Sequence, residues 1–462
     1  MKKEKKMTDA KTIKAERTQN LHDVYDNKIP KRVPISFGLG LTTVADYAGV
    51  DRKDAYWNPS LLEKASDELC EMIPSDTCMY SGTVYTPYSA QSLGAKNKIM
   101  SDTGYMQHPN TVSMFPEDYD EFIKDPYATI IEKFLPRIYD NMDPANNPTR
   151  SLFALVQEAN LNGQVAALQM PMMRRLAEKH GYPDGEGRGG GGRTPLDWLA
   201  DQLRSFDGIC VDVRRIPDKV VEALDAAYPM LYKSGRCPDP NNVNRYAVAM
   251  FQLHMATYLN EKAFVKTWYE PWKRQLEDYS SLGMRCGAFL EENWTKKIDY
   301  LLDLPTGMYF TWEYGDPKLF KEKLGKKFVL SSGFPLKYIT QCTKDEIIDK
   351  TKEWLDIMMP GGQYIFGFDK SALTMGDINL ENLKACFETV LKYGGYDNAG
   401  APTGEIFNKA DYTFSNPPEF KSRAYRSWED YKKLYPNTPE SAKKMVMAAE
   451  DAVFSSIFYM SC

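Results

Sequence analysis

The chain has 462 residues and a mass of 52.8 kDa, with 43% hydrophobic and 26% charged residues. These proportions are those of a globular protein with a large core, so they exclude disorder along the whole chain. The formal net charge of −5 and the pI near 5.7 argue against a nucleic-acid binder, which would carry a basic surplus. No run approaches the roughly 18 apolar residues of a membrane helix, so we expect no membrane partner.

The N-terminal residues are rich in charge and have no apolar stretch behind them, so they do not form a signal peptide. We expect residues 1–30 to be a polar arm that frays or lies on a partner subunit. The eight cysteines are scattered and include no CxxC pair. Without an export signal, this pattern predicts reduced thiols in a cytoplasmic protein.

From about residue 33, short apolar runs alternate with longer amphipathic segments, an order that predicts parallel strands with helices between them. Eight alternating units favour a (β/α)8 TIM barrel over residues 31–396, followed by a C-terminal extension, residues 397–462. The candidate strands are Val33–Leu39, Thr77–Tyr80, Gly208–Val213, Ala247–Met255, Met284–Glu291, Met308–Glu313, Phe328–Ser332 and Tyr364–Phe368.

Two further segments have distinct patterns. Residues 149–180 predict one long helical region. The stretch GYPDGEGRGGGGR, Gly181–Arg193, has seven glycines but lacks the GxxxxGK[ST] order of a phosphate-binding loop. We therefore expect a flexible surface loop, with a mobile lid as the alternative.

In a (β/α)8 barrel the active site lies at the carboxyl ends of the strands. Polar residues follow many of the candidate strands at that end, which predicts a site there. A carboxylate just past a buried strand, such as Glu291, is costly unless it is paired, protonated or bound to a metal. A helix N-terminal charge for Glu291 and a structural role for His254 remain the alternatives. The residues at strand ends are Asp212, His254, Glu291, Glu313, Ser331, Ser332 and Asp369.

Oxygen and nitrogen donors suit zinc acting as a Lewis acid, and Glu291, His254 and Asp369 are the expected ligands. Three tyrosines, Tyr80, Tyr85 and Tyr88, follow the second candidate strand. They are expected either to line an aromatic substrate pocket or to pack a loop.

Five stretches carry a family resemblance: FPEDYDEFIKDP, FQLHMATYLNEKAFVKTWYEPWKRQLEDYSSLG, FLEENWTKKIDYLLDLPTG, GDPKLFKEKLGKKFVLSSGFP, and PGGQYIFGFDK with LENLKACFETVLKYGGY. With them the chain resembles the uroporphyrinogen decarboxylase superfamily over about residues 30–396. The resemblance implies a (β/α)8 barrel. That superfamily contains the decarboxylase and many cobalamin-dependent methyltransferases.

Departures from the family pattern indicate the branch. PISFGLGLTTVADYAG stands where the decarboxylase has its RQAGR motif, so no arginine is present to bind the acetates of uroporphyrinogen. The His-x-Cys of the thiol-activating methyltransferases reads Phe289-Leu290-Glu291 here, and their distant Cys falls near Asp369. A harder carboxylate site suits a zinc ion, or a proton, that polarises an oxygen.

The resemblance thus implies the methyltransferase component of an O-demethylase. Such a protein moves a methyl group from an aryl methyl ether to the Co(I) of a cobalamin that a separate corrinoid protein carries. Glu291, His254 and Glu313 are the expected catalytic residues. The tyrosines named above, with Asp212 and Arg214, are expected to bind substrate.

Two other functions stay open. A metal-free decarboxylase or lyase would bind a small carboxylated substrate through Arg214 and Arg215. A non-catalytic binding subunit would instead have lost both family motifs. The charged N-terminal arm and the long C-terminal extension also allow a homodimer.

Overall fold

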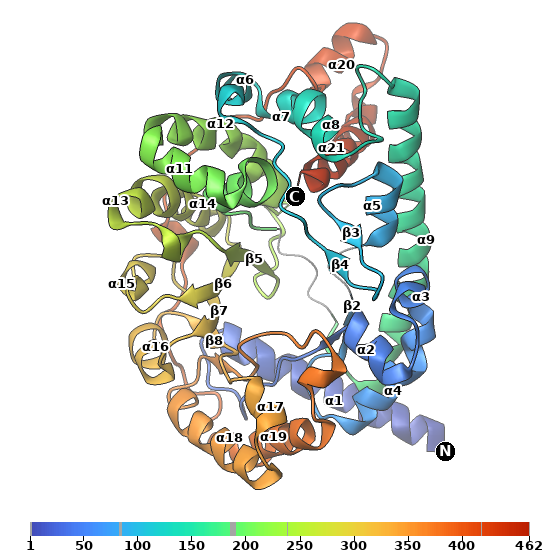
Figure 1. Ribbon diagram of the computed structural model, residues 1–462. Coiled ribbons are helices and arrows are strands. Elements are labelled where there is room, and N and C mark those ends of the chain that lie inside the picture. Colours follow the sequence, from blue (N-terminus) through green and yellow to red (C-terminus); the bar gives the residue numbers. More distant parts are fainter. Residues whose placement is uncertain (1, 83–85, 185–190, 238, 417, 462) are drawn as a thin grey trace.

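The computed structural model describes residues 2–82, 86–184, 191–237, 239–416 and 418–461. It is a mixed α/β protein with a parallel five-stranded sheet in the order β5-β6-β7-β8-β9 (Figure 1). The strands of this sheet are β5 Val248–Leu253, β6 Arg285–Asn293, β7 Tyr309–Tyr314, β8 Val329–Ser331 and β9 Tyr364–Ile365.

The parallel arrangement continues past β9. Ile35 forms an isolated parallel bridge with Phe366, and β1 Leu39–Gly40 pairs in parallel with β2 Tyr80–Gly82. On the other side of the sheet, Gly192 N donates to Met250 O at 3.2 Å. Among the described residues no strand pairing joins β2 to β5, so the strands form an arc with helices outside it (Figure 1).

Helices cover the outer face of the arc and fill the connections. Strands β3 Ile99–Met100 and β4 Met106–Gln107 form a small antiparallel pair. The α-helices are α1 Lys2–Tyr25, α2 Leu41–Ala48, α3 Arg52–Trp57, α4 Glu63–Met72, α5 Pro87–Leu93, α6 Tyr119–Lys124, α7 Pro126–Thr129, α8 Leu135–Ile138, α9 Pro148–His180, α10 Pro195–Trp198, α11 Phe206–Arg215, α12 Pro217–Gly235, α13 Glu261–Ala263, α14 Glu270–Ser281, α15 Ile298–Leu301, α16 Pro317–Leu324, α17 Lys337–Gln341, α18 Lys344–Met358, α19 Leu380–Tyr393, α20 Trp428–Leu434 and α21 Lys443–Met460.

The third candidate strand, Gly208–Val213, is wrong, because this segment lies in α11. Ser205 begins the helix by accepting a hydrogen bond from Gly208 N. Ile209 and Val213, four residues apart, form its buried face. Four-residue spacing is the helical period, and in so short a run it outweighs the apolar character that favoured a strand.

The expectation of a fraying or partner-bound arm is also wrong, because α1 packs on its own chain. Val24 is fully buried against Val329 and Ile365, near the amino ends of β8 and β9. Arg285 Nη2 donates to Tyr25 O at 2.7 Å. The described part of the arm therefore closes that end of the sheet.

The C-terminal extension returns to the body of the protein. The buried side chains of α21 include Phe454, Ile457 and Phe458. Tyr139 Oη donates to Met460 O at 2.8 Å, which ties the end of this helix to the segment after α8. No described helix has the length and apolar character to cross a membrane.

Candidate functional site

The register of the sheet brings the three expected catalytic residues together. Leu253, Leu290 and Trp312 pair across β5, β6 and β7. His254, Glu291 and Glu313 come one residue later on each strand, so they share the opposite face at the carboxyl ends. The spacing between strand and polar residue, read from the sequence, therefore gathers these side chains in one row.

His254 lies between two carboxylates. Its Nδ1 is 2.5 Å from Asp201 Oδ2, and its Nε2 is 3.1 Å from Glu291 Oε2. The hydrogen bond with Asp201 is the main cause that raises the pKa of His254 to about 9, and burial opposes it. The ring is therefore an imidazolium at neutral pH, with both nitrogens donating.

Asp201 and its neighbour Asp197 were missed by the reasoning from strand ends. Asp197 Oδ1 accepts from Trp268 Nε1 at 2.8 Å and from Met255 N at 3.0 Å. Its other oxygen accepts from His254 N at 3.1 Å, so this carboxylate fixes the chain where β5 ends. Burial raises the pKa of Asp197 to about 7. The signal in the sequence was the four-residue spacing of the two aspartates in a helical segment.

Glu291 is a half-buried carboxyl group whose burial raises its pKa, while the His254 imidazolium partly offsets this effect. The next residue, Glu292, has φ +61°, in the left-handed region that a residue with a side chain enters at a cost. Glu292 N donates to Glu313 Oε2 at 3.3 Å. The strained turn thus presents Glu291 toward His254 and links the ends of β6 and β7.

Glu313 and Asp369 border a separate cavity of about 800 Å³. Glu313 Oε1 is 3.0 Å from Lys370 Nζ; burial opposes but hydrogen bonding to Lys370 lowers the pKa of Glu313. Asp369 Oδ1 accepts from Leu336 N at 2.9 Å. The cavity lies at the carboxyl ends of β7 and β8, beside α17 and α18. Its aromatic lining residues are Trp312, Tyr314, Phe334, Tyr338 and Trp354.

The other expected substrate-binding residues do not join this row. Asp212 is buried in α11, where it accepts from Tyr119 Oη at 2.9 Å and Arg204 Nε at 2.8 Å. Arg214 is exposed on the same helix. Placing these two residues at a strand end was wrong, because the strand is a helix.

The tyrosine cluster follows the packed-loop alternative where it is described. Tyr80 and Tyr88 are 1% and 5% exposed, and Trp57 packs on Tyr88 with ring centroids 5.7 Å apart. Tyr85 lies outside the described residues, as do residues 185–190 of the expected loop or lid. Neither described tyrosine lines the cavity at β7 and β8.

The expected zinc ligands are only partly assembled. His254 Nε2 and Glu291 Oε2 lie side by side, and Asp201 holds Nδ1 as a carboxylate holds a metal-bound histidine. A catalytic zinc needs three protein ligands, and Asp369 is engaged with Leu336 N instead. The residues present in this arrangement therefore do not complete a zinc site.

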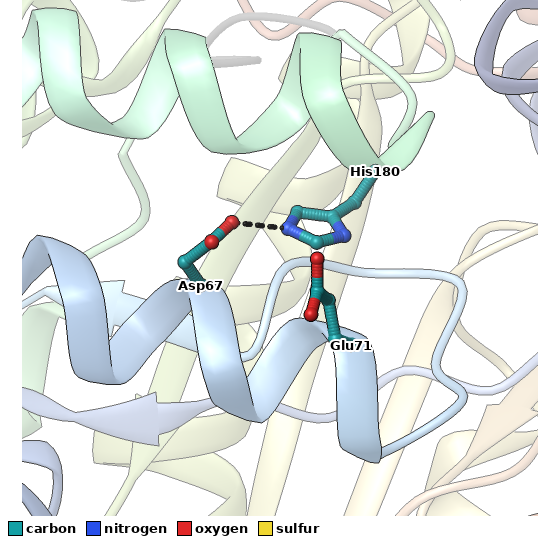
Figure 2. A group of neighbouring side chains, drawn as sticks. All are labelled: Asp67, Glu71 and His180. Carbon is teal, nitrogen blue, oxygen red and sulfur yellow. Dashed lines mark hydrogen bonds and ion pairs between the residues drawn. The ribbon is translucent and has the colours of Figure 1, made fainter. Parts of the chain in front are cut away.

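One group of three donors does converge in the described part of the chain, between α4 and α9. Ligand atoms of Asp67, Glu71 and His180 lie within 4.8 Å of one another (Figure 2). Lys179 Nζ is already 2.5 Å from Asp67 Oδ2 and 3.1 Å from Glu71 Oε1. An ammonium group thus neutralises both carboxylates, and the group is an ion-pair network that joins the two helices.

No family model matches the chain, and no curated protein matches it. The chemistry of the row at the strand ends is therefore the main guide to what the protein does.

Proposed function

We propose that this chain is a (β/α)8-barrel methyltransferase that moves a methyl group from an aryl methyl ether to the Co(I) of a corrinoid protein. The observation that carries the proposal is the Asp201–His254–Glu291 chain of hydrogen-bonded groups at the carboxyl ends of β5 and β6. It combines with the sequence resemblance described above, in which Glu291 stands where the thiol-activating branch has a metal-binding cysteine.

The arrangement of strands supports the barrel. Parallel segments follow one another from β2 through β1 and β9 to β5, with helices outside them (Figure 1). The expected catalytic row lies at the carboxyl ends, where barrel enzymes have their active sites.

The chemical problem is the departure of an unstable phenolate. When the corrinoid protein is bound, its cobalt supplies the nucleophile that accepts the methyl group. Glu291, whose pKa is raised by burial, donates a proton to the ether oxygen as the carbon–oxygen bond breaks, so a neutral phenol leaves. The His254 imidazolium, 3.1 Å from Glu291, returns a proton to the carboxylate, and Asp201 keeps the ring oriented.

A second candidate is a lyase acting on a carboxylated substrate. Lys337, Lys350 and Lys370 line the cavity beside the catalytic row, and these side chains would pair with a carboxylate. The two functions differ in their product, because the lyase would release carbon dioxide without any need for Co(I).

The test uses the purified chain with methoxyphenols and chemically reduced cobalamin as the methyl acceptor. We expect phenol release together with loss of the Co(I) absorbance. Glu291→Gln removes the proton donor and lowers kcat by about 10²–10⁴-fold. Glu292→Gln is the matched control, since this exposed neighbour does not contact His254, and it changes kcat by less than about threefold.

Two results would overturn the proposal. One is the absence of methyl transfer from every ether in the series. The other is equal loss of activity in the two glutamate variants, which would indicate a general electrostatic effect instead of proton donation by Glu291.

A further inference from the structure

The outer face of α9 carries a continuous row of exposed apolar residues. Their spacing of four and three residues in turn is the heptad spacing of a helix seam that packs against another helix. Leu152, Val156 and Met170 are 59%, 51% and 58% exposed. The complete row, which we call the α9 seam, is Leu152, Val156, Ala159, Gly163, Ala166 and Met170.

Charge is missing from this part of the helix. Between Arg150 and Arg174, Glu158 is the sole charged residue. Its carboxylate accepts from Ser89 Oγ of α5 at 2.9 Å, so it faces the body of the protein. A solvent-facing helix surface usually carries charged and polar side chains, and an apolar row of this length marks an interaction site.

Gly163 gives a second, independent indication. A glycine inside a helix destabilises it by about 0.5–1 kcal/mol relative to alanine. A Cβ atom at Gly163 would meet nothing within 4 Å, so packing within the described chain gives no reason for glycine there. The close approach of another helix does give one, because small residues at a seam let two backbones come together.

The seam has the same order of sizes in both directions. Around position 161, Leu152 corresponds to Met170, Val156 to Ala166, and Ala159 to Gly163. A two-fold axis at that height, with a second α9 running antiparallel, places the large side chains of each copy against the opposite end of the other. Such self-complementarity is what an isologous dimer interface requires.

We propose that the α9 seam is the interface of a homodimer, in which the α9 helices of two copies pack antiparallel across a two-fold axis near position 161. The seam spans 18 residues, or about 27 Å at the rise of an α-helix. Helix α9 lies along the outside of the molecule, on the other side from β6 and β7 (Figure 1). The dimer therefore leaves the carboxyl ends of these strands open to a corrinoid protein.

The first test measures mass in solution by size-exclusion chromatography with light scattering. We expect wild-type protein at about twice 52.8 kDa. Val156→Glu places a charge in the seam and raises the dimer Kd by at least about 100-fold, which yields monomer. Val453→Glu on α21, equally apolar and 58% exposed, is the control and stays dimeric. Unchanged thermal unfolding of both variants excludes misfolding as the cause.

The second test determines the direction of packing with cysteine pairs. In the antiparallel arrangement Ala159 of one copy faces Gly163 of the other. Mixed Ala159→Cys and Gly163→Cys chains should therefore form a mixed disulfide on mild oxidation, whereas each variant alone should not. The Gly163 site has room for the new side chain within its own chain.

A monomeric wild-type protein would overturn the proposal, whichever other partner the seam then binds. A dimer that Val156→Glu leaves intact would also overturn it. A disulfide in the Ala159→Cys protein alone would refute the antiparallel arrangement. Gly163→Leu should weaken the dimer without lowering thermal stability, because it blocks close approach but meets no atom of its own chain.

Discussion

Replacing Asp201 by asparagine tests the charge state on which the proposed chemistry depends. The carboxylate of Asp201 is the main cause that raises the pKa of His254 from 6.5 to about 9. A shift of this size corresponds to about 3 kcal/mol in full, at about 1.4 kcal/mol per pKa unit. Because 37% of the His254 side chain is exposed, solvent screening reduces the stabilisation to about 1–2 kcal/mol. Glu291 and Asp197 remain in the variant, so we expect the pKa of His254 to fall by about 1–1.5 units.

The sign of the pH dependence follows from the raised pKa. The folded protein holds the proton on His254 more tightly than the unfolded chain, so this stabilisation is fully present below pH 6.5 and is lost as the pH rises through about 9. The free energy of unfolding of Asp201→Asn should therefore lie about 1–2 kcal/mol below wild type near pH 6 and approach it above about pH 9.

Proton NMR of the imidazole rings measures the pKa directly, because the chain has four histidines. The signal that disappears in His254→Gln identifies the residue. Asp207→Asn, an exposed carboxylate on the neighbouring α11, is the matched control and should leave that signal unchanged. A wild-type His254 signal that titrates near 6.5, or one that does not respond to Asp201→Asn, would refute the assignment of an imidazolium to this site.

Three further outcomes are expected. Asp118 is fully buried; burial opposes but hydrogen bonding to Arg137 lowers its pKa to about 2, so Asp118→Asn costs about 2 kcal/mol at neutral pH. Urea unfolding should show that this loss shrinks as the pH falls from 3.8 through about 2, and a pH-independent loss would contradict the ion pair. Gly333→Ala forces a Cβ to within 2.3 Å of the Trp312 ring at φ +84°, so thermal unfolding should show a loss of about 3 kcal/mol or more, and a neutral effect would contradict this packing. Elemental analysis should find the same zinc content in wild type and Glu291→Ala, whereas stoichiometric zinc lost in the variant would replace proton donation with Lewis-acid chemistry.

The strands of the main sheet were predictable because buried parallel strands are short, continuous apolar runs. Candidate strands Ala247–Met255 and Met308–Glu313 correspond closely to β5 and β7. The same criterion failed at Gly208–Val213, since an apolar run of six residues fits a buried strand and a helix turn equally well. Only the packing of Ile209 and Val213 on one side decides between them.

The catalytic row was predictable for a related reason, and its partners were not. His254 and Glu291 each follow a strand of the same sheet, so the topology alone brings them together. Asp201 lies 53 residues before His254 on a helical turn, and nothing in the local pattern indicates that this turn reaches the end of β5. Contacts of this kind depend on tertiary packing, which periodicity does not encode.

The N-terminal arm shows how a polar composition conceals a structural role. Most of its residues are exposed, and its hydrophobic contribution depends on a few positions such as Val24. A single fully buried valine contributes about 1.5–3 kcal/mol, which is small in any average over the segment but enough to fix the end of a helix.

The two ends of the parallel sheet differ in a way that connects stability with the proposed activity. At the amino ends, the apolar contact of Val24 with Val329 and Ile365 closes the sheet. At the carboxyl ends, Glu292 and Ser332 have φ of +61° and +69°, and a strained backbone of this kind costs about 1–3 kcal/mol per residue. Carboxylates also crowd there, which adds repulsion to strain. A protein tolerates such a cost at one end when packing elsewhere holds the strands in place, and the sheet therefore presents its reactive groups at the end that it does not need for stability.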